Sequence, residues 1–264
     1  MTGNKAPAGQ NNGGREAQKR LAGIRKELAA LAEPDYAAFA AKLLRKPQEA
    51  VPGGSAARLL GVRLPALRKM AARLAKEDWA GNLEALEGAG DGAAFEEIML
   101  RGFLIGQAKI APGKAFALIR GFLPCVDNWS LCDSFCAGLK FAEKNREALW
   151  DFLQPCFASS QEYEVRFAVV TALDYFVTEE YLERVLGQLE AVRHDAYYVS
   201  MAVAWAVSVC YVRFPVRTQE WMETCRLDED TFRRAVQKIR ESRRVSPEDK
   251  ERLKGLWMRC PQRG

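Results

Sequence analysis

The chain has 264 residues, of which 48% are hydrophobic and 28% are charged, and its formal net charge is +5. This apolar content is ample for a core in one large domain or two small ones, but no run approaches the roughly 18 apolar residues that would span a membrane. The mild positive charge permits a polyanionic partner without proving one.

The chain begins with MTGNKAPAGQNNGG, which has no apolar core and therefore excludes a signal peptide. We expect residues 1–13 to be a disordered tail and residues 14–264 to form a single domain. The expected protein is soluble, monomeric and cytoplasmic, of the bacterial type.

Beyond this tail, apolar residues recur every three or four positions, which predicts helices and almost nothing else. The predicted helices cover residues 15–32, 64–76, 93–108, 112–123, 145–157, 164–176, 179–192, 197–211, 229–242 and 247–258, with a further helix starting after Asn128. By composition alone EVRFAVVTAL could be a buried strand, but its length and its helical neighbours favour a helix. The predicted fold class is therefore all-α.

Helix-start signals fall at the expected breaks in this pattern. Pro65 and Pro112 suit the first turn of a helix, and Thr178 and Ser246 suit N-caps. The run Ser-Pro-Glu-Asp from Ser246 is a strong start signal.

An internal repeat is the strongest organisational signal. Aromatic residues stand 34 residues apart at Phe95, Trp129, Tyr163 and Tyr197. A fixed period in this range with two helices per unit predicts a helical solenoid, in which each helix pair packs against its neighbours. The W-x2-L-G-x2-Y signature of tetratricopeptide repeats is missing, so a HEAT-like array is preferred.

The seven cysteines have no paired short spacing and are interpreted as reduced core thiols. Cys132 and Cys136 lie four residues apart without a nearby histidine, which argues against zinc. The only histidine, His194, cannot by itself build the metal site of an HD hydrolase. We therefore expect no metal and no cofactor.

The segment VDNWSLCDSFCAGL places Trp129 and Asp133 one helical turn apart, with no basic residue within a turn of the acid. In the repeat register Asp133 aligns with Phe167, and Arg166 aligns with Cys132. Asp133 and Arg166 can therefore face one groove from equivalent helices. A structural salt bridge between two repeats is the simpler interpretation. The nearby aromatic residues favour a functional site, because Tyr197, Met201 and Trp205 follow at four-residue spacing on the next equivalent helix.

These residues carry a resemblance to a known family. From about Tyr36 to the last helix, the chain resembles the DNA alkylation repair family of HEAT-like repeat proteins, the AlkD-like DNA glycosylases. DNWSLCDSF resembles the segment with the family's catalytic Trp and Asp, here Trp129 and Asp133, and EVRFAVV resembles the segment with its active-site Arg, here Arg166. YYVSMAVAWA resembles its aromatic segment, which places Tyr197, Tyr198 and Trp205.

The resemblance implies hydrolysis of the N-glycosidic bond of N3- or N7-alkylated purines in double-stranded DNA, without a metal and without extruding the base into a pocket. The alkylated base is already cationic and leaves without a general acid. A single carboxylate, Asp133, would then stabilise the oxocarbenium-like sugar and position the water. Trp129 and Trp205 would offer aromatic faces to the cation. Arg166 would hold a phosphate or orient Asp133.

Basic residues that could bind DNA phosphates gather near the C-terminus and after the Trp129 helix. The candidates are Lys140, Arg233, Arg234, Lys238, Arg243 and Arg244. A charge run is usually a solvated helix face, but its excess over acid is what a phosphate-binding groove requires.

The N-terminal region departs from the family pattern. Family members use an N-terminal helix, including an aromatic residue, to trap the damaged duplex. Residues 32–61 here predict a short helix and then a Pro/Gly-rich loop, in which Tyr36 or Phe39 is the available aromatic residue. Two hypotheses therefore stand: an alkylpurine DNA glycosylase, or a non-catalytic HEAT-like module that binds DNA, or else protein, through the same concave basic groove.

Overall fold

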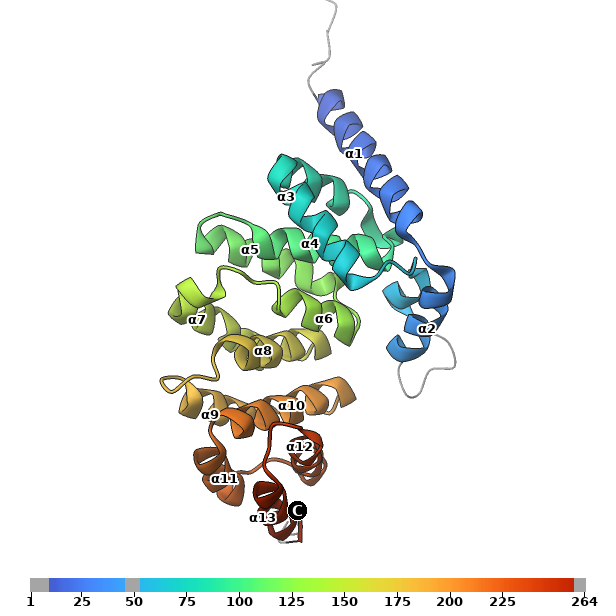
Figure 1. The fold of residues 1–264 in the computed structure, drawn as a ribbon. Helices are drawn as coiled ribbons and strands as arrows, with labels where there is room; N and C mark the ends of the chain where they lie inside the picture. Colours follow the sequence, from blue (N-terminus) through green and yellow to red (C-terminus); the bar gives the residue numbers. More distant parts are fainter. Residues whose placement is uncertain (1–9, 46–52, 259–264) are drawn as a thin grey trace, which may run out of the picture. The chain divides into compact units, whose positions relative to one another are not determined.

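The computed structural model describes residues 10–45 and 53–258, and Figure 1 shows that these residues form helices. They contain thirteen α-helices, joined in places by short 3-10 turns, and no strand lies within these two ranges. The predicted all-α helical repeat fold is confirmed. None of the helices within these ranges is long and apolar enough to cross a membrane.

The helices fall into two compact units, Met1–Lys140 and Phe141–Gly264. The first contains α1 (Gln10–Leu31), α2 (Pro34–Leu44), α3 (Leu64–Glu87), α4 (Phe95–Gln107), α5 (Pro112–Phe122) and α6 (Trp129–Cys136). The second contains α7 (Arg146–Phe157), α8 (Glu162–Tyr175), α9 (Leu182–Ala191), α10 (Tyr197–Arg213), α11 (Pro215–Thr224), α12 (Glu229–Glu241) and α13 (Pro247–Met258).

In the first unit, α4 is the central helix and packs against α3, α5 and α6, while α1 lies on α3. The core includes Leu28, Leu67, Leu100 and Leu104, all at most 1% exposed. The chain leaves helical geometry at Asp78, whose φ and ψ are −153° and 86°, and the Asp78 carboxylate accepts a hydrogen bond from the Gly81 N–H at 3.0 Å. Asp78 therefore restarts the helix as an N-cap, which explains why the periodicity predicted only residues 64–76.

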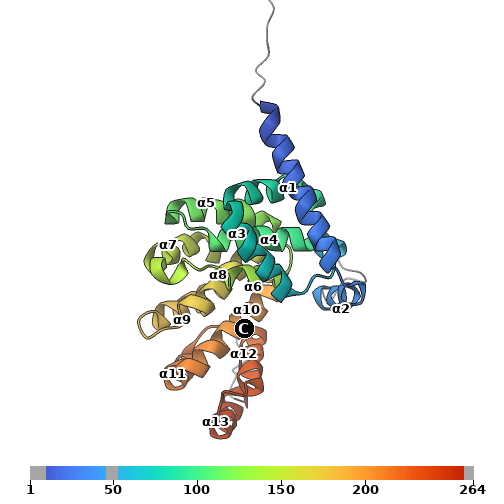
Figure 2. The ribbon, with the colours of Figure 1, turned by 45° about the horizontal axis from the view of Figure 1, so that its top comes forward.

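In the second unit the helices form two rows. Figures 1 and 2 show α7, α9 and α11 in one row and α8, α10 and α12 in the other. Within the second row α10 packs against both α8 and α12. This arrangement is the stacking of helix pairs that a repeat array requires.

The 34-residue repeat coincides with the helix starts. Phe95, Trp129 and Tyr197 are the first residues of α4, α6 and α10, and Tyr163 is the second residue of α8. The segment that resembled a strand by composition is α8, whose residues from Tyr163 to Leu173 are almost all buried. Its uniform burial explains why its polar face was hard to see in the sequence.

Polar contacts between neighbouring repeats of the second unit follow the same register. They join side chains, or a side chain and a main-chain N–H, that lie 34 to 36 residues apart. The pairs are Glu147 with Tyr181, Gln154 with Gln188, Glu183 with Arg217, and Glu190 with the Arg226 N–H. Contacts at this spacing fix how far one repeat is rotated against the next.

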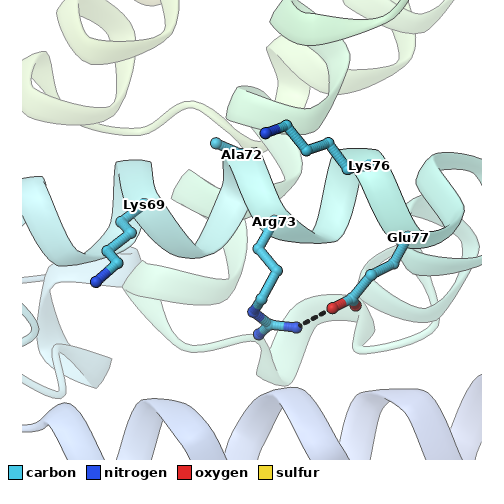
Figure 3. A pocket seen from close by; sticks show the side chains of 5 residues that line it. All are labelled: Lys69, Ala72, Arg73, Lys76 and Glu77. Atoms are coloured by element: carbon cyan, nitrogen blue, oxygen red, sulfur yellow. Dashed lines mark hydrogen bonds and ion pairs between the residues drawn. The ribbon is translucent and has the colours of Figure 1, made fainter.

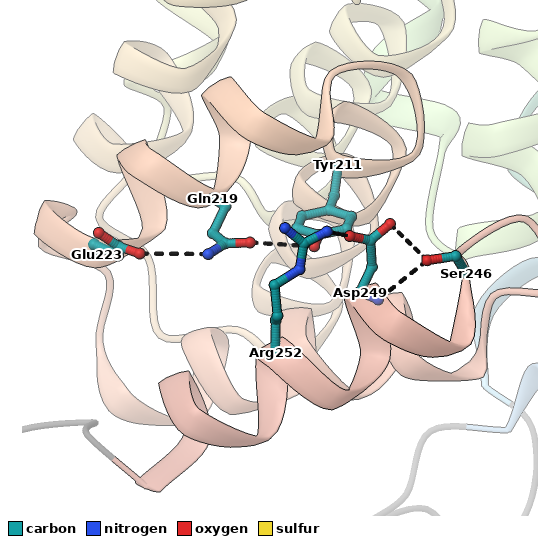
Figure 4. A network of polar contacts seen from close by, with 6 residues as sticks. All are labelled: Tyr211, Gln219, Glu223, Ser246, Asp249 and Arg252. Atoms are coloured by element: carbon teal, nitrogen blue, oxygen red, sulfur yellow. Dashed lines mark hydrogen bonds and ion pairs between the residues drawn. The ribbon is translucent and has the colours of Figure 1, made fainter.

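The last helix, α13, begins at the predicted cap. Ser246 Oγ accepts a hydrogen bond from the Asp249 N–H at 3.1 Å and donates one to the Asp249 carboxylate at 2.9 Å. Figure 4 shows this pair beside Arg252 and Tyr211, and burial raises the pKa of the Tyr211 hydroxyl. Leu253 is fully buried, and α13 packs against α12.

Three details differ from expectation. Helix α1 begins at Gln10, inside the expected tail of residues 1–13, and residues 1–9 lie outside the described part of the chain. The Thr178 carbonyl accepts from the Tyr181 and Leu182 N–H groups, so Thr178 starts a turn, and α9 begins only at Leu182. Helix α11 was not predicted, because its buried positions are Thr218 and Met222 and a buried threonine is invisible to apolar periodicity. The expectation of one domain over residues 14–264 stays a prediction.

Candidate functional site

Helix α6 carries the predicted Trp129 and Asp133 on one edge. Asn128 caps its N-terminus, with its side-chain oxygen accepting the Leu131 N–H at 3.0 Å, so the predicted helix start is confirmed. Leu131, Cys132, Phe135 and Cys136 are buried. Trp129 and Asp133 are both partly exposed and lie on the edge that these four residues leave open.

The start of α6 is fastened to the segment Gly54–Arg58. The Asp127 carboxylate accepts hydrogen bonds from the Ser55 N–H at 2.6 Å and from the Ser55 hydroxyl at 2.5 Å. The Asn128 side-chain amide donates to Ser55 Oγ at 3.1 Å and to Asp127 at 2.8 Å. Trp129 is the next residue, so this cluster fixes the position of the main chain from which the Trp129 indole extends.

Gly54 is required for this contact. Its φ is +57°, and a Cβ atom there would stand 2.2 Å from the Asp127 carboxylate. A side chain at this position would be strained by the backbone and would displace the acid. The only sequence signal for this cluster is the polar pair Asp127-Asn128 before an apolar helix.

Two further carboxylates are buried at the start of α4. Glu96, 1% exposed, accepts the main-chain N–H groups of Leu60, Gly61 and Val62 at 2.7 to 3.0 Å. Glu97 pairs with Arg25 at 2.5 Å and accepts the Ala94 N–H at 2.8 Å. Both acids thus hold main chain or α1 in place, and the catalytic role of Asp133 stays a prediction.

In the second unit, Arg166 joins α8 to the start of α10. It is 5% exposed, and its Nη1 donates to the Tyr198 carbonyl at 2.7 Å. Its guanidinium carbon lies 5.9 Å from the centre of the Tyr198 ring. Arg166 and Asp133 belong to different units, so their pairing stays a prediction.

The predicted aromatic stripe on α10 lies at the surface. Tyr197 is 38% exposed, and Met201 and Trp205 are partly exposed. The intervening residues of α10, such as Val203 and Val207, are buried. A stripe at helical spacing is usually core, and here it remains available to a ligand.

Arg234 of α12 lies against this stripe. Its guanidinium carbon is 4.9 Å from the centre of the Tyr197 ring, and its Nη1 is 3.6 Å from the Met201 sulfur. Its Nε is buried without a hydrogen-bond partner, and no carboxylate in the described residues pairs with it. Arg233, the adjacent residue, forms an ion pair with Glu229. Arg234 is therefore a cation held in place by Tyr197, and its guanidinium N–H groups can still donate hydrogen bonds to a ligand.

The other predicted basic residues are more dispersed. Lys238 follows Arg234 by one turn and is partly exposed, while Arg243 and Arg244 are exposed just after α12 ends. Lys140, in the first unit, is exposed with its ammonium 3.4 Å from the Gln107 side-chain oxygen. Thus Arg166, Tyr197, Tyr198 and Arg234 are brought together within the second unit, to which Lys140 does not belong.

Five of the six cysteines in the described ranges are buried, as core thiols would be, and Cys125 is partly exposed. Within residues 10–45 and 53–258, no group of His, Cys, Asp and Glu side chains is arranged to hold a metal ion. His194 lies in the loop before α10, where its Nδ1 accepts the Ala196 N–H at 3.0 Å.

Comparison with known proteins gives one match. A family described as "DNA alkylation repair enzyme" matches residues 24–245. No curated protein and no solved structure matches the chain. The matched range contains both α6 and the cluster of Arg166, Tyr197, Tyr198 and Arg234.

Proposed function

Because the chain belongs to the DNA alkylation repair family, we propose that it hydrolyses the N-glycosidic bond of cationic N3- or N7-alkylated purines in duplex DNA. The observation that carries this proposal is the pairing of Trp129 and Asp133 on the partly exposed edge of α6, a helix whose other side is buried. The proposal places the protein in the cytoplasm as a monomer.

The chemistry needs only one acid. An alkylated purine carries positive charge, so it departs as a neutral base when the glycosidic bond breaks. The sugar becomes oxocarbenium-like, and the Asp133 carboxylate stabilises it and positions the attacking water. Ordinary glycoside hydrolysis differs, since it uses a second carboxyl group to protonate the leaving oxygen.

The expected size of this effect is substantial. A carboxylate about 4 Å from the developing cation interacts by roughly 4 kcal/mol at an effective dielectric constant near 20. If this stabilisation arises mainly in the transition state, it corresponds to about three orders of magnitude in rate.

Other residues position the duplex. Trp129 and Trp205 present aromatic faces to the cationic nucleotide. Arg234, already oriented by Tyr197, offers its free N–H donors to a phosphate, and Lys140, Lys238, Arg243 and Arg244 add sequence-independent attraction. Arg166 holds the start of α10, and with it Tyr197 and Tyr198, in place for the duplex.

The test combines two measurements on the same protein. Release of 7-methylguanine from methylated duplex DNA is followed beside a binding titration with the same duplex. We expect both release and binding. Binding without release would remove the glycosylase proposal and leave a non-catalytic DNA-binding module.

One observation bears on the choice between these two candidates, because the lesion trap of the family uses an aromatic residue of the N-terminal helix. The guanidinium carbon of Arg63 covers the Tyr36 ring at 4.6 Å, so this aromatic residue of α2 is already engaged. Phe39 and Leu43 are 58% and 54% exposed, and they remain as the apolar face that α2 offers to a duplex. If Phe39 helps to trap the lesion, Phe39→Ala should slow base release without changing the melting temperature. Equal rates of base release by wild type and Phe39→Ala would show that Phe39 does not help to trap the lesion.

A further inference from the structure

Helix α3 presents basic side chains that the family-derived site does not include. Arg68, Lys69, Arg73 and Lys76 lie on its first four turns and are exposed. Arg68 is held in place by the Phe103 ring, with its guanidinium carbon 4.8 Å from the ring centre. This surface belongs to the first unit, which also contains Trp129 and Asp133.

The acids near this surface are already paired with arginines. Arg73 binds both Glu77, at 2.7 Å, and Glu27 of α1, and these hydrogen bonds raise the pKa of its guanidinium. Asp78 pairs with Arg20 at 3.0 Å. Lys69 and Lys76 have no hydrogen-bond or ion-pair partner in the described residues. The two ammonium groups therefore carry the uncompensated charge.

These lysines border a hollow of about 380 Å³, lined by Lys69, Ala72, Arg73, Lys76 and Glu77. Figure 3 shows Ala72 between the two lysines along α3, with Lys69 and Arg73 extending to one side of the helix and Arg73 pointing toward Glu77. The small side chain of Ala72 leaves room for a ligand, and Lys76 extends along the helix toward it. The site is thus an open basic depression.

The spacing of the lysines favours a chain of phosphates over a single small anion. They are seven residues apart, so their main-chain positions are separated by about 10.5 Å along the helix. This separation exceeds the width of one phosphate group, so the two ammonium groups suit two phosphates of one backbone better than a single small anion.

We propose that the α3 hollow binds the phosphodiester backbone of the duplex, with Lys69 and Lys76 contacting phosphates on either side of Ala72. This inference rests on the proposed function, since it names a further contact with the same partner. It assigns DNA binding to α3 in addition to α12.

Lysine acetylation tests the contact in the intact protein. A duplex should slow acetylation of Lys69 and Lys76 severalfold, while the exposed Lys109 and Lys114 serve as controls that react unchanged. Inorganic phosphate at matched ionic strength should protect neither pair. Unprotected Lys69 and Lys76 in a saturated complex would overturn the inference, and equal protection by inorganic phosphate would assign the hollow to small anions instead.

Substitution gives an independent readout. Lys69→Gln with Lys76→Gln should reduce the slope of log affinity against log salt by about 1.8, which is two contacts at about 0.9 each. Lys109→Gln with Lys114→Gln should leave that slope unchanged. Ala72→Glu should weaken binding more than the equally large Ala72→Gln, because only the former adds a repelling charge.

The outcomes separate this inference from the proposed function. The lysine variant should need a higher duplex concentration for half-maximal base release, because it binds the duplex more weakly. A wild-type salt slope retained in full by a folded lysine variant would reject the α3 contact and leave the glycosylase proposal intact. Failure of wild type to bind any duplex would reject both.

Discussion

The guanidinium of Arg234 lies over the Tyr197 ring, with 4.9 Å between its carbon and the ring centre. The contact joins α12 to α10 and holds a cation with which no acid pairs in the part of the chain that the structure describes. An oriented guanidinium loses less conformational freedom on binding a phosphate than a mobile one does. Arg234 should therefore contribute more to DNA binding than its neighbours of equal charge.

Arg234→Gln should weaken duplex binding and lower the salt slope by about 0.9. Arg233→Gln is the matched control and should have a smaller effect, because Arg233 is paired with Glu229. Neutralising Arg233, Arg234 and Lys238 together should weaken binding across sequences and flatten the slope further. Salt titrations of all three proteins measure this, and a larger loss from Arg233 than from Arg234 would contradict it.

Asp133→Asn should abolish most base release, by about three orders of magnitude, while affinity for the duplex stays equal or rises slightly. The amide keeps the shape of the carboxylate but removes the charge that stabilises the sugar cation. Little stability should be lost, because Asp133 is partly exposed.

The control for this substitution is Asp151→Asn, which removes the same charge from an exposed position of α7. It should release base at the wild-type rate. If Asp133→Asn instead lowers the melting temperature strongly and affects the rate no more than Asp151→Asn does, Asp133 forms a structural salt bridge.

Asn128→Ala should lower the free energy of unfolding by about 1 kcal/mol, because the Leu131 N–H loses its cap. Base release should fall as well, since the same side chain ties α6 to Ser55 next to Trp129. Asn128→Ser keeps a capping oxygen and should recover most of the stability. Urea unfolding of the three proteins measures the change, and wild-type stability of Asn128→Ala would contradict the assigned cap.

Because of Glu147, the free energy of unfolding should depend on pH in the acid range. The hydrogen bond from the Tyr181 hydroxyl at 2.5 Å, and then Arg184, hold the pKa of Glu147 below its usual value. A lowered folded-state pKa stabilises the protein above the unfolded pKa of about 4.3, and this contribution is lost as pH falls through the folded pKa.

Glu147→Gln should therefore melt at a lower temperature than wild type near pH 7, and the difference should close as the pH falls below about 4. Glu143→Gln, at an exposed glutamate, should show no comparable gap at either pH. Melting curves at pH 7, 5 and 3 measure the effect. A gap that widens toward pH 3 would have the wrong sign.

The features predicted successfully are those that local sequence determines. The 34-residue aromatic register coincides with the starts of α4, α6, α8 and α10, because each unit of a repeat array places its helices at the same positions of the repeat. Asn128 and Ser246 were recognisable as caps because their partners lie three residues away.

The features that sequence patterns missed depend on partners far along the chain. Glu96 serves three main-chain N–H groups 34 to 36 residues earlier, and the main chain carries no sequence signal. Ser55 meets Asp127 across 72 residues. Arg234 was predicted only as one charge in a basic run, because its contact with Tyr197 depends on the packing of α10 against α12.

The number of residues between the two partners of a contact determines how soon the contact can form during synthesis. In the second unit, side-chain pairs close over 34 to 36 residues, so one helix pair can dock as soon as the next leaves the ribosome. In the first unit, Ser55 and Arg25 each wait for a partner 72 residues further on. At about 5–20 residues per second this wait lasts roughly 4–14 seconds. The half that is synthesised first therefore stays incomplete longer, and misfolding during synthesis should begin there.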